Sequence, residues 1–290
     1  MSDDVNSERR RLLLAGALGG VGLGLAGGIA PARAQDANAS TLEAIRASGN
    51  LRIGVAQGEP WFFKDQSSGE WKGLGWGVGA ALARELNVTP VPVETTWGTA
   101  VAGLQAGQFD VMFAMDATQQ RALSVEFPVQ PMFYYAQAVL ARDGLDVTNW
   151  EALNKPEVKL GVVLGTSPDR DVTVRLPQAD IQRFPNADEA GAAFAAGRVD
   201  ALSLFHPALV TIGNRLKRGT VVVPTPVRSS ASSAAVRREA DKSWRDWVGH
   251  AIGYLYETGE TQKIYEEFLT FRGIDPKTAP GLSPSSWTKA

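Results

Sequence analysis

The amino-acid sequence predicts an α/β protein made of two successive units, each an open and mainly parallel sheet flanked by helices. Three observations predict it. Strand-like and helix-like segments alternate from residue 51 to residue 113, and the same alternation begins again at residue 158. Longer extended segments, at residues 134–141 and 234–237, connect the two series. Alternation of strands and helices is typical of parallel sheets with helices on both faces.

The first unit begins with a short helix and continues as strands separated by helices. The helix starts at Thr41, and Gly49 ends it. Apolar and polar residues then alternate at residues 51–56, as they do in a strand. An aromatic loop at residues 57–73 has the turn residues of a hairpin. The other elements expected in this unit are helices at 78–86 and 99–107 and strands at 91–94 and 109–113.

The second unit repeats this pattern, and the chain then returns to the first unit. We expect the chain to cross between two lobes twice, near residues 139–143 and 230–236. Two amphipathic helices follow the second crossing. The expected elements are strands at 158–163, 181–184 and 199–204, helices at 169–176 and 187–196, and the two final helices at 241–257 and 260–270.

These crossings define the expected domains and the place of the functional site. Lobe 1 comprises residues 41–139 and 236–271, lobe 2 comprises residues 143–231, and residues 272–290 form a loosely packed C-terminal extension. Ligands of open α/β sheets bind beyond the carboxyl ends of the strands. Two such sheets that face each other predict a cleft between the lobes, with the crossing segments acting as two hinge strands.

Residues 1–34 have the features of a signal peptide. A basic cluster at residues 9–11 precedes a Gly/Ala/Leu-rich apolar stretch, and an A-x-A cleavage site ends at Ala34. The apolar stretch contains too much glycine for a good membrane span. The basic cluster resembles the twin-arginine export motif. We expect twin-arginine (Tat) export to the periplasm and cleavage near Ala34, with the general export route and an uncleaved anchor as alternatives.

The composition excludes several classes of function. The chain has no Cys and only two His, which excludes thiol chemistry and argues against a zinc site or a Ser-His-Asp enzyme. With 29 basic and 31 acidic residues, its net charge is −2, which argues against a nucleic-acid partner. We expect neither a metal nor a cofactor.

Eight short motifs occur in the order in which one known family has them. Residues 97–110 are similar to its W-x-x-x-[IV]-x-x-L-x-x-G-x-[FY]-D block, and residues 118–121 to its T-x-x-R. The other stretches lie at 42–55, 60–74, 125–128, 164–167, 196–200 and 259–268. Over about residues 41–271 the chain thus resembles family 3 of the bacterial extracellular solute-binding proteins of ABC importers, the polar amino acid-binding type.

This resemblance implies the type II, two-lobed periplasmic-binding-protein fold and a transport function. A member of the family captures a small carboxylate-bearing solute, an amino acid or a derivative, as its lobes close. The closed form then docks on a membrane permease of an ABC transporter. We expect a monomer that binds a small-molecule solute in the periplasm and is not an enzyme.

The resemblance also implies ligand contacts on both lobes. The Arg of T-x-x-R binds the ligand's carboxylate in this family, and Arg121 has that position, with Thr118 opening the motif. A guanidinium binds a carboxylate through two parallel bonds and keeps its charge when desolvated. Thr166 and Ser167 lie between a strand and a helix, where hydroxyls and free N–H groups bind anions or simply cap the helix. Trp97 stands where the family has an aromatic residue that stacks on the ligand.

The aromatic loop supplies further candidates. Trp61, Phe62 and Phe63 follow the first strand, and at least one should reach the cleft, because an exposed apolar run would be a liability. Trp61 and Phe63 are our candidates, with packing in the core as the alternative. Tyr134 and Tyr135 are expected in the core or at the rim.

The sequence departs from the family on the side that holds the ligand's amine. Residues 73–77 read G-L-G-W-G where relatives have G-F-D-V-D, and the second-lobe Asp falls at Phe205 or His206, of which His206 is a candidate contact. Asp116 stands where relatives favour Ser or Thr, and Glu59 lies in the first loop. Our hypothesis is that Asp116, with Glu59, is the counter-ion for a cationic group that the aromatics also contact. A ligand without an ammonium group is the alternative.

Two classes of enzyme remain as alternatives. Gly75, Gly77 and Ala80 fit the G-x-G-x-x-A fingerprint of NAD(P)-dependent oxidoreductases, but a long loop separates them from the first strand, which disfavours that class. Some relatives with the implied fold are periplasmic cyclohexadienyl dehydratases. Such an enzyme needs a general acid in the cleft, and no spacing selects one among the acidic residues and His206.

Overall fold

The structure, a computed structural model, describes residues 40–287. The expected signal peptide and its cleavage site near Ala34 lie outside these residues. The first described element, α1 (Thr41–Ser48), shows why the sequence forms a helix there. Ser40 and Glu43 make a reciprocal capping box, and Gly49 ends the helix with a φ of 68°.

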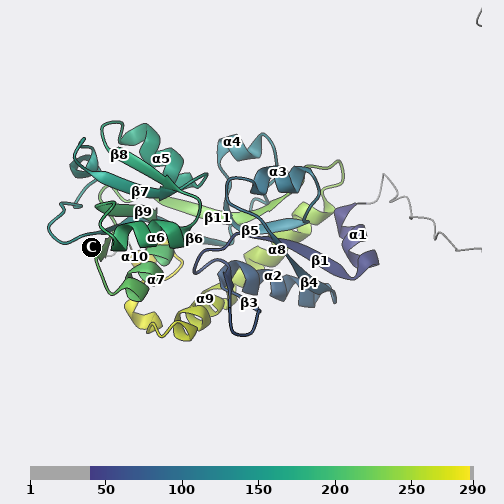
Figure 1. Ribbon diagram of the computed structural model, residues 1–290. Helices are drawn as coiled ribbons and strands as arrows, with labels where there is room; N and C mark the ends of the chain where they lie inside the picture. The colour runs from purple at the N-terminus through teal and green to yellow at the C-terminus, as the bar shows by residue number, and fades with distance from the viewer. Residues whose placement is uncertain (1–39, 288–290) are drawn as a thin grey trace, which may run out of the picture. The chain divides into compact units, whose positions relative to one another are not determined.

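One mixed sheet connects the two lobes (Figure 1), in the strand order β4-β1-β5-β11-β6-β9-β7-β8, with β10 paired to β6. Strands β1, β4 and β5 are parallel to one another, as are β7, β8 and β9, whereas β6 and β11 are antiparallel to their neighbours. Each lobe therefore has the expected parallel core. The strands are β1 Asn50–Val55, β4 Thr89–Glu94, β5 Val111–Asp116, β6 Phe133–Ala141, β7 Lys159–Val163, β8 Asp180–Phe184, β9 Ala201–Phe205, β10 Thr220–Val222 and β11 Ser229–Val236. A separate hairpin, β2 (Phe63–Lys64) and β3 (Trp71–Lys72), forms in the aromatic loop.

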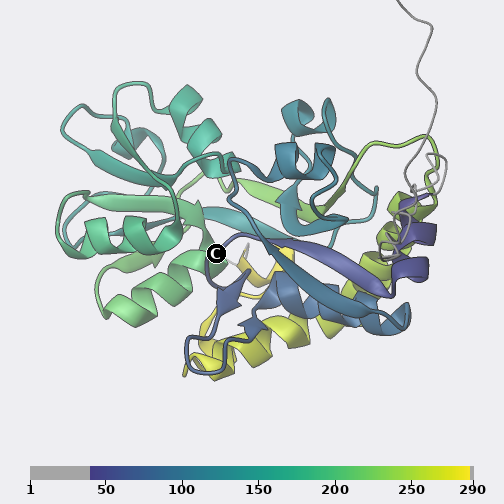
Figure 2. The same ribbon diagram turned by 45° about the vertical axis from the view of Figure 1, so that its right-hand side comes forward.

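Helices lie on both sides of the strands in each lobe. In lobe 1, α3 and α4 lie on one side, and α2, α8 and α9 on the other (Figures 1 and 2). In lobe 2, α5 and α6 pack on β7, β8 and β9, and α7 packs on β6, β9 and β10. The helices are α2 Leu74–Glu85, α3 Ala100–Gln105, α4 Gln119–Ala122, α5 Ser167–Arg175, α6 Ala187–Ala195, α7 His206–Leu216, α8 Ser243–Glu257, α9 Glu260–Phe271 and α10 Pro284–Trp287, with 3-10 turns at Glu151–Leu153 and Pro276–Thr278. None of them, within the described part of the chain, is long and apolar enough to cross a membrane.

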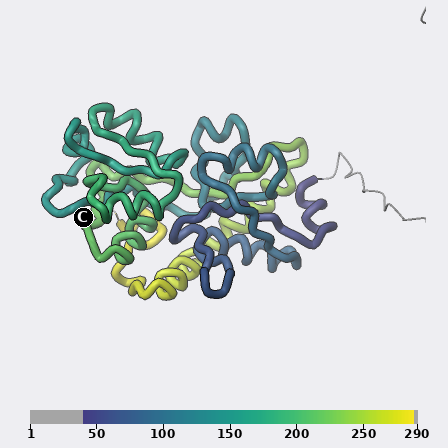
Figure 3. The backbone as a smooth tube through the Cα atoms, in the orientation of Figure 1, coloured from purple at the N-terminus to yellow at the C-terminus, as the bar shows by residue number. Residues whose placement is uncertain are grey.

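Two strands change partners as they pass between the lobes. β6 pairs with β11 as far as Ala136 and with β9 from Gln137 onward. β11 pairs with β6 up to Ser232 and with β5 from that residue to Val236. In Figure 3 both crossings run side by side between the lobes. The exact lobe boundaries given above stay a prediction.

The glycines that fit a dinucleotide-binding fingerprint are packing positions. A β-carbon on Gly75 would lie 2.6 Å from the ring of Phe62. One on Gly77 would lie 2.5 Å from Cγ2 of Ile264 in α9. Both glycines therefore let α2 lie close to the rest of lobe 1, which explains them without a phosphate ligand.

Two features differ from what the sequence led us to expect. Helix α7 is not among the expected elements, although Pro207 in its first turn is a typical signal of a helix start. The expectation of a loosely packed C-terminal extension is wrong at two of its residues, although its other described residues are exposed or half-buried. Ile274 and Leu282 are buried, and the Leu282 carbonyl accepts a 3.1 Å hydrogen bond from the N–H of Tyr134 in β6. The yellow end of the chain accordingly lies beside lobe 2 (Figure 3).

Candidate functional site

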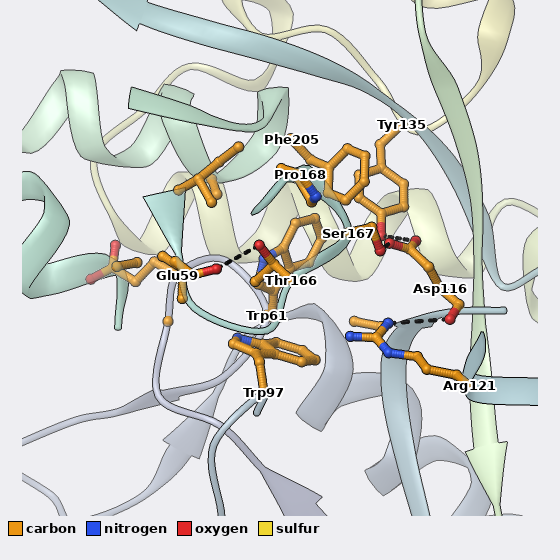
Figure 4. A pocket seen from close by; sticks show the side chains of 16 residues that line it. Glu59, Trp61, Trp97, Asp116, Arg121, Tyr135, Thr166, Ser167, Pro168 and Phe205 are labelled. Atoms are coloured by element: carbon orange, nitrogen blue, oxygen red, sulfur yellow. Dashed lines mark hydrogen bonds between the residues drawn. The ribbon is translucent and has the colours of Figure 1, made fainter. Parts of the chain in front are cut away.

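A cavity of about 50 Å³ lies between the lobes (Figure 4). It is found at the carboxyl ends of β5, β7 and β9, where open α/β sheets bind ligands. Side chains from both lobes and from the hinge strand β6 form its walls. The polar and aromatic lining residues are Glu59, Trp61, Trp97, Asp116, Arg121, Tyr135, Thr166, Ser167 and Phe205.

The cavity brings together seven of the ten residues predicted from the sequence. These are Glu59, Trp61, Trp97, Asp116, Arg121, Thr166 and Ser167. The structure does not bring Phe63, Thr118 or His206 to the cavity wall. Among residues 40–287, no group of three or more His, Asp or Glu side chains is arranged to hold a metal ion.

Arg121 is a buried cation that holds backbone carbonyls of both lobes. Arg121 lies in α4, and only 6% of the residue is exposed. Nη1 donates to the carbonyl of Asp116 (3.2 Å) and Nη2 to the carbonyl of Gly165 in lobe 2 (3.1 Å). Within the described chain, no carboxylate forms an ion pair with this guanidinium. Burial lowers the pKa of Arg121, and the charge of Asp116 opposes that effect.

A second arginine adds to the positive charge at this place. Arg170 of α5 also donates to the carbonyl of Gly165, at 3.4 Å, and its charge further lowers the pKa of Arg121. Guanidinium nitrogens that meet only neutral carbonyls keep their preference for a carboxylate, because an ionised partner gives a stronger bond. The surroundings of Arg121 therefore suit an anionic ligand group.

Asp116 ends β5 and is linked to both lobes through hydroxyl groups. Its carboxylate accepts hydrogen bonds from Tyr135 of β6 and from Ser167 at the start of α5 in lobe 2. Ser230 of β11 donates a third bond, of 3.2 Å. Burial raises the pKa of Asp116, while the bonds from Ser167 and Tyr135 act in the opposite direction. The carboxylate thus lies where the lobes meet, within reach of a cationic ligand group.

Glu59 lines the cavity, but two arginines, one in lobe 2 and one at the start of the C-terminal extension, already bind its carboxylate. Arg272, which follows α9, lies 3.0 Å from it, and Arg215 of α7 lies 3.6 Å from it. Arg215 also pairs with Asp188 at 2.8 Å. Burial raises the pKa of Glu59, and the two arginines oppose this. Glu59 therefore joins the lobes through ion pairs and is a poorer candidate for a ligand's counter-ion than Asp116.

The three consecutive aromatic residues divide between the site and the core. Trp61 lines the cavity and stacks on Phe133 with ring centroids 5.6 Å apart. Phe62 is fully buried beside Trp97. Phe63 points away from the cavity toward the aromatic rings of α9, which accounts for its place outside the site.

The other two predicted residues that do not reach the cavity make hydrogen bonds to the backbone of elements that form its walls. Thr118 caps α4, and its hydroxyl accepts a 3.2 Å bond from the N–H of Arg121. It thereby fixes the start of the turn that carries the guanidinium. His206 is fully buried, and its Nδ1 accepts a 3.1 Å bond from the N–H of Ala136 in β6. Its side chain is thus a structural contact of the hinge strand.

Three residues outside the ten predicted ones belong to the site. Tyr135 was expected in the core or at the rim, Phe205 was one of the two positions given for the second-lobe Asp, and Ser230 was not expected from the sequence. Tyr135 and Phe205 line the cavity, with ring centroids 3.6 Å apart, and Ser230 bonds to Asp116. Ser230 lies directly opposite Tyr135 in the pairing of β11 with β6. This register brings both hydroxyls to one carboxylate, and it arises between segments that are far apart in the sequence.

Two lobes joined by two strands, with a buried guanidinium in the cleft between them, define a two-lobed solute-binding protein. The chain belongs to the bacterial extracellular solute-binding proteins, family 3, whose family model matches residues 51–271. The resemblance seen in the sequence motifs is thereby confirmed.

Similar proteins are also binding proteins by name. The chain is 28% identical over 258 residues to the general L-amino acid-binding periplasmic protein AapJ of Rhizobium johnstonii, covering 84% of this chain and 75% of that protein. It is 27% identical over 240 residues to the ABC transporter glutamine-binding protein GlnH of Bacillus subtilis, covering 81% of this chain and 86% of the relative. These relatives are binding components and not enzymes by name.

Solved structures confirm the predicted type II fold. The ancestral amino acid-binding protein AncCDT-1, a precursor of cyclohexadienyl dehydratase, superposes with a TM-score of 0.71 at 31% identity, covering 79% of this chain and 99% of that one. The solute receptor for L-cysteine of Neisseria gonorrhoeae gives a TM-score of 0.72 at 23% identity, over 82% of this chain and 98% of the receptor. At that identity the receptor shows the fold alone.

Proposed function

We propose that this protein is the periplasmic solute-binding component of an ABC importer and that it captures a small amino acid or a carboxylate-bearing derivative. The observation that carries this proposal is Arg121, a buried guanidinium at the cavity wall that meets carbonyl oxygens in place of a carboxylate. The names of AapJ and GlnH support an amino acid as the ligand, and the name of AapJ supports the periplasm as the compartment.

Capture proceeds by closure of the lobes. Lobe 1 presents Arg121, Asp116 and the aromatic residues Trp61 and Trp97, and lobe 2 brings Thr166 and Ser167 against them. The bonds from Arg121 to Gly165 and from Ser167 to Asp116 join the lobes and so favour the closed form. The closed protein then docks as a monomer on a membrane permease, after export directed by the predicted signal peptide.

Asp116 is our candidate for the group that binds an α-ammonium. Its carboxylate lies beside Arg121, so the α-ammonium of an amino acid could bind Asp116 while its α-carboxylate binds Arg121. Trp61 and Trp97 supply aromatic faces for the remainder of the ligand. Glu59 contributes to closure of the lobes through its ion pairs with Arg215 and Arg272.

We propose binding rather than catalysis. A dehydratase on this fold would need a carboxylic acid that is free to protonate a leaving group. The two carboxylates at the cavity are held by other groups, Glu59 by two arginines and Asp116 by three hydroxyls. Incubation with a cyclohexadienyl acid, followed by chromatography of the products, distinguishes the two functions.

A ligand screen on the chain that begins at residue 35 tests the proposed function. We expect one or more L-amino acids, betaines, ectoine-like compounds or simple carboxylates to raise the melting temperature, because a ligand that binds only the folded state stabilises it. Arg121→Gln should weaken that binding by about a hundredfold, as expected for loss of a charge-assisted contact. Arg84→Gln, an exposed arginine on α2, is the matched control. Unchanged affinity in Arg121→Gln would overturn the proposal.

A further inference from the structure

A second cavity, which we name the outer chamber, lies beside the first. Its volume is about 410 Å³, against about 50 Å³ for the inner cavity. The two share Ser167, Pro168 and Phe205 as common walls. The outer chamber is further lined by Gln137 of β6, by Asp171 and Arg175 of α5, and by residues 227–230. The outer chamber therefore begins on the far side of Ser167 from the carboxylate site at Arg121.

Helix α5 provides a polar path from one cavity to the other. Ser167, Asp171 and Arg175 are spaced by four residues, so their side chains lie on one face of the helix, about 6 Å apart along its axis. The first of them bonds to Asp116 in the inner cavity. The other two line only the outer chamber. The distance from the inner site to the outer one is thus about one to two helical turns.

The outer end of this path carries an excess of positive charge. In the outer chamber, Asp171 binds both Arg175 (2.6 Å) and Arg228 (2.5 Å), so that two cations share one carboxylate. The guanidinium of Arg228 is held over the ring of Trp150, 4.4 Å from its centroid. Because both arginines already use one carboxylate, a ligand cation would find no free acid there. An anion would find two guanidinium groups.

At the inner end, two arginines share one carbonyl oxygen. Arg121 and Arg170 both donate to the carbonyl of Gly165, and Asp116 is the carboxylate whose charge acts on Arg121. Nη2 of Arg170 is buried and has no hydrogen-bond partner in the described chain. A buried guanidinium nitrogen without a hydrogen bond is costly, and an anionic ligand that reached it would remove that cost.

A buried amide lies between the two ends. Gln137 is 4% exposed, and its Nε2 donates a 3.1 Å bond to Ser203. Its Oε1 forms no hydrogen bond with any described residue, and the side chain lines the outer chamber. It can accept a hydrogen bond from a donor on a ligand that passes through.

We propose that the outer chamber is the second half of the ligand site and binds a second carboxylate. The favoured solute is therefore an elongated dicarboxylate, with or without an amino group beside its first carboxylate. The first carboxylate binds at Arg121 and the second at Arg175 and Arg228. This inference rests on the proposed function, since it needs the first carboxylate at Arg121.

Matched pairs of acid and amide test the inference. Calorimetric titration of the chain from residue 35 with L-2-aminosuberate and its side-chain amide, and with suberate and its monoamide, compares ligands of equal size that are long enough to reach from one cavity to the other. We expect the acid of at least one pair to bind about tenfold more tightly or better. In the double variant Arg175→Gln/Arg228→Gln that preference should disappear, while affinity for the amide stays within about twofold.

An ion pair at the end of the hinge strand β6 gives the control. Arg142 binds Asp200 at 2.6 Å and is exposed to a similar degree as Arg175, but it lines neither cavity. Arg142→Gln should keep the preference for the acid. If the acid and amide bind equally well to the unchanged protein, or if Arg142→Gln abolishes the preference too, the outer chamber is not an acid site and the proposed function still stands. If neither these compounds nor any amino acid binds, the proposed function itself is refuted.

Discussion

Gly165 of lobe 2 lies against the backbone of Gly98 in lobe 1. A β-carbon on Gly165 would come within 2.8 Å of Cα of Gly98 and within 3.1 Å of its nitrogen. Gly165 also has a φ of 78°, a conformation that favours glycine. Its carbonyl accepts the bond from Arg121. A turn that requires glycine thus forms the contact between the lobes beside the carboxylate site.

Gly165→Ala should therefore impair closure. We expect ligand affinity to fall by at least about tenfold, because the new methyl group keeps the backbones of the lobes apart. The positive φ should also lower the free energy of unfolding by about 1 kcal/mol. Calorimetric titration and urea unfolding measure the two effects.

Gly98→Ala is the control for this substitution. A β-carbon on Gly98 would have only Oγ1 of Thr96 within 4 Å, at 3.8 Å. Its affinity should stay within about twofold of the unchanged protein. Equal losses in both variants would contradict the role of Gly165 in closure.

The order of strands and helices could be predicted because each element carries its own periodicity. Strand β5, for example, is apolar up to its last residue, and α5 starts at a Thr-Ser-Pro sequence that caps a helix. Arg121 and Ser167 could be assigned through motifs that keep them at fixed distances from such elements. Helix α7 escaped prediction although Pro207 marks its start.

The remainder of the site depends on contacts between distant segments. Tyr135 and Ser230 reach Asp116 only because β6 and β11 pair in one particular register. A shift of β11 by one residue would turn the Ser230 hydroxyl to the opposite face of the sheet from Tyr135. Likewise, nothing in the sequence near Glu59 indicates that Arg215 and Arg272 bind it.

Asp116→Asn tests whether this carboxylate binds an ammonium group. The substitution keeps the size of the side chain and removes its negative charge. We expect affinity for an L-amino acid to fall by about tenfold to a hundredfold, as for loss of a charged hydrogen bond. The corresponding 2-hydroxy acid, which has no ammonium, should change by less than about threefold. Equal changes for both ligands, measured by calorimetric titration, would refute the counter-ion hypothesis.

Leu282→Ala tests the packing of the C-terminal extension. Leu282 is 2% exposed, so its truncation should lower the free energy of unfolding by about 3 kcal/mol through lost burial and a residual cavity. Leu123 is 78% exposed, and Leu123→Ala should change it by less than about 0.5 kcal/mol. Urea unfolding gives both values, and similar values for the two variants would mean that the extension does not pack as described.

His206 should make the stability of the protein depend on pH. Burial lowers the pKa of His206 from 6.5 to about 4, and its Nδ1 accepts a bond from Ala136. Between these two pH values the unfolded chain binds a proton that the folded chain does not, so stability rises with pH. The contribution lost as pH falls from 6.5 to 4 is about 3 kcal/mol. His206→Gln should therefore have a flatter curve of stability against pH, measured by urea unfolding at pH 4.5 to 7.5, whatever its absolute stability.

His250→Gln, at the other histidine and on the exposed side of α8, is the control and should keep the slope of stability against pH of the unchanged protein. If His206→Gln keeps that slope as well, His206 is not the group that titrates.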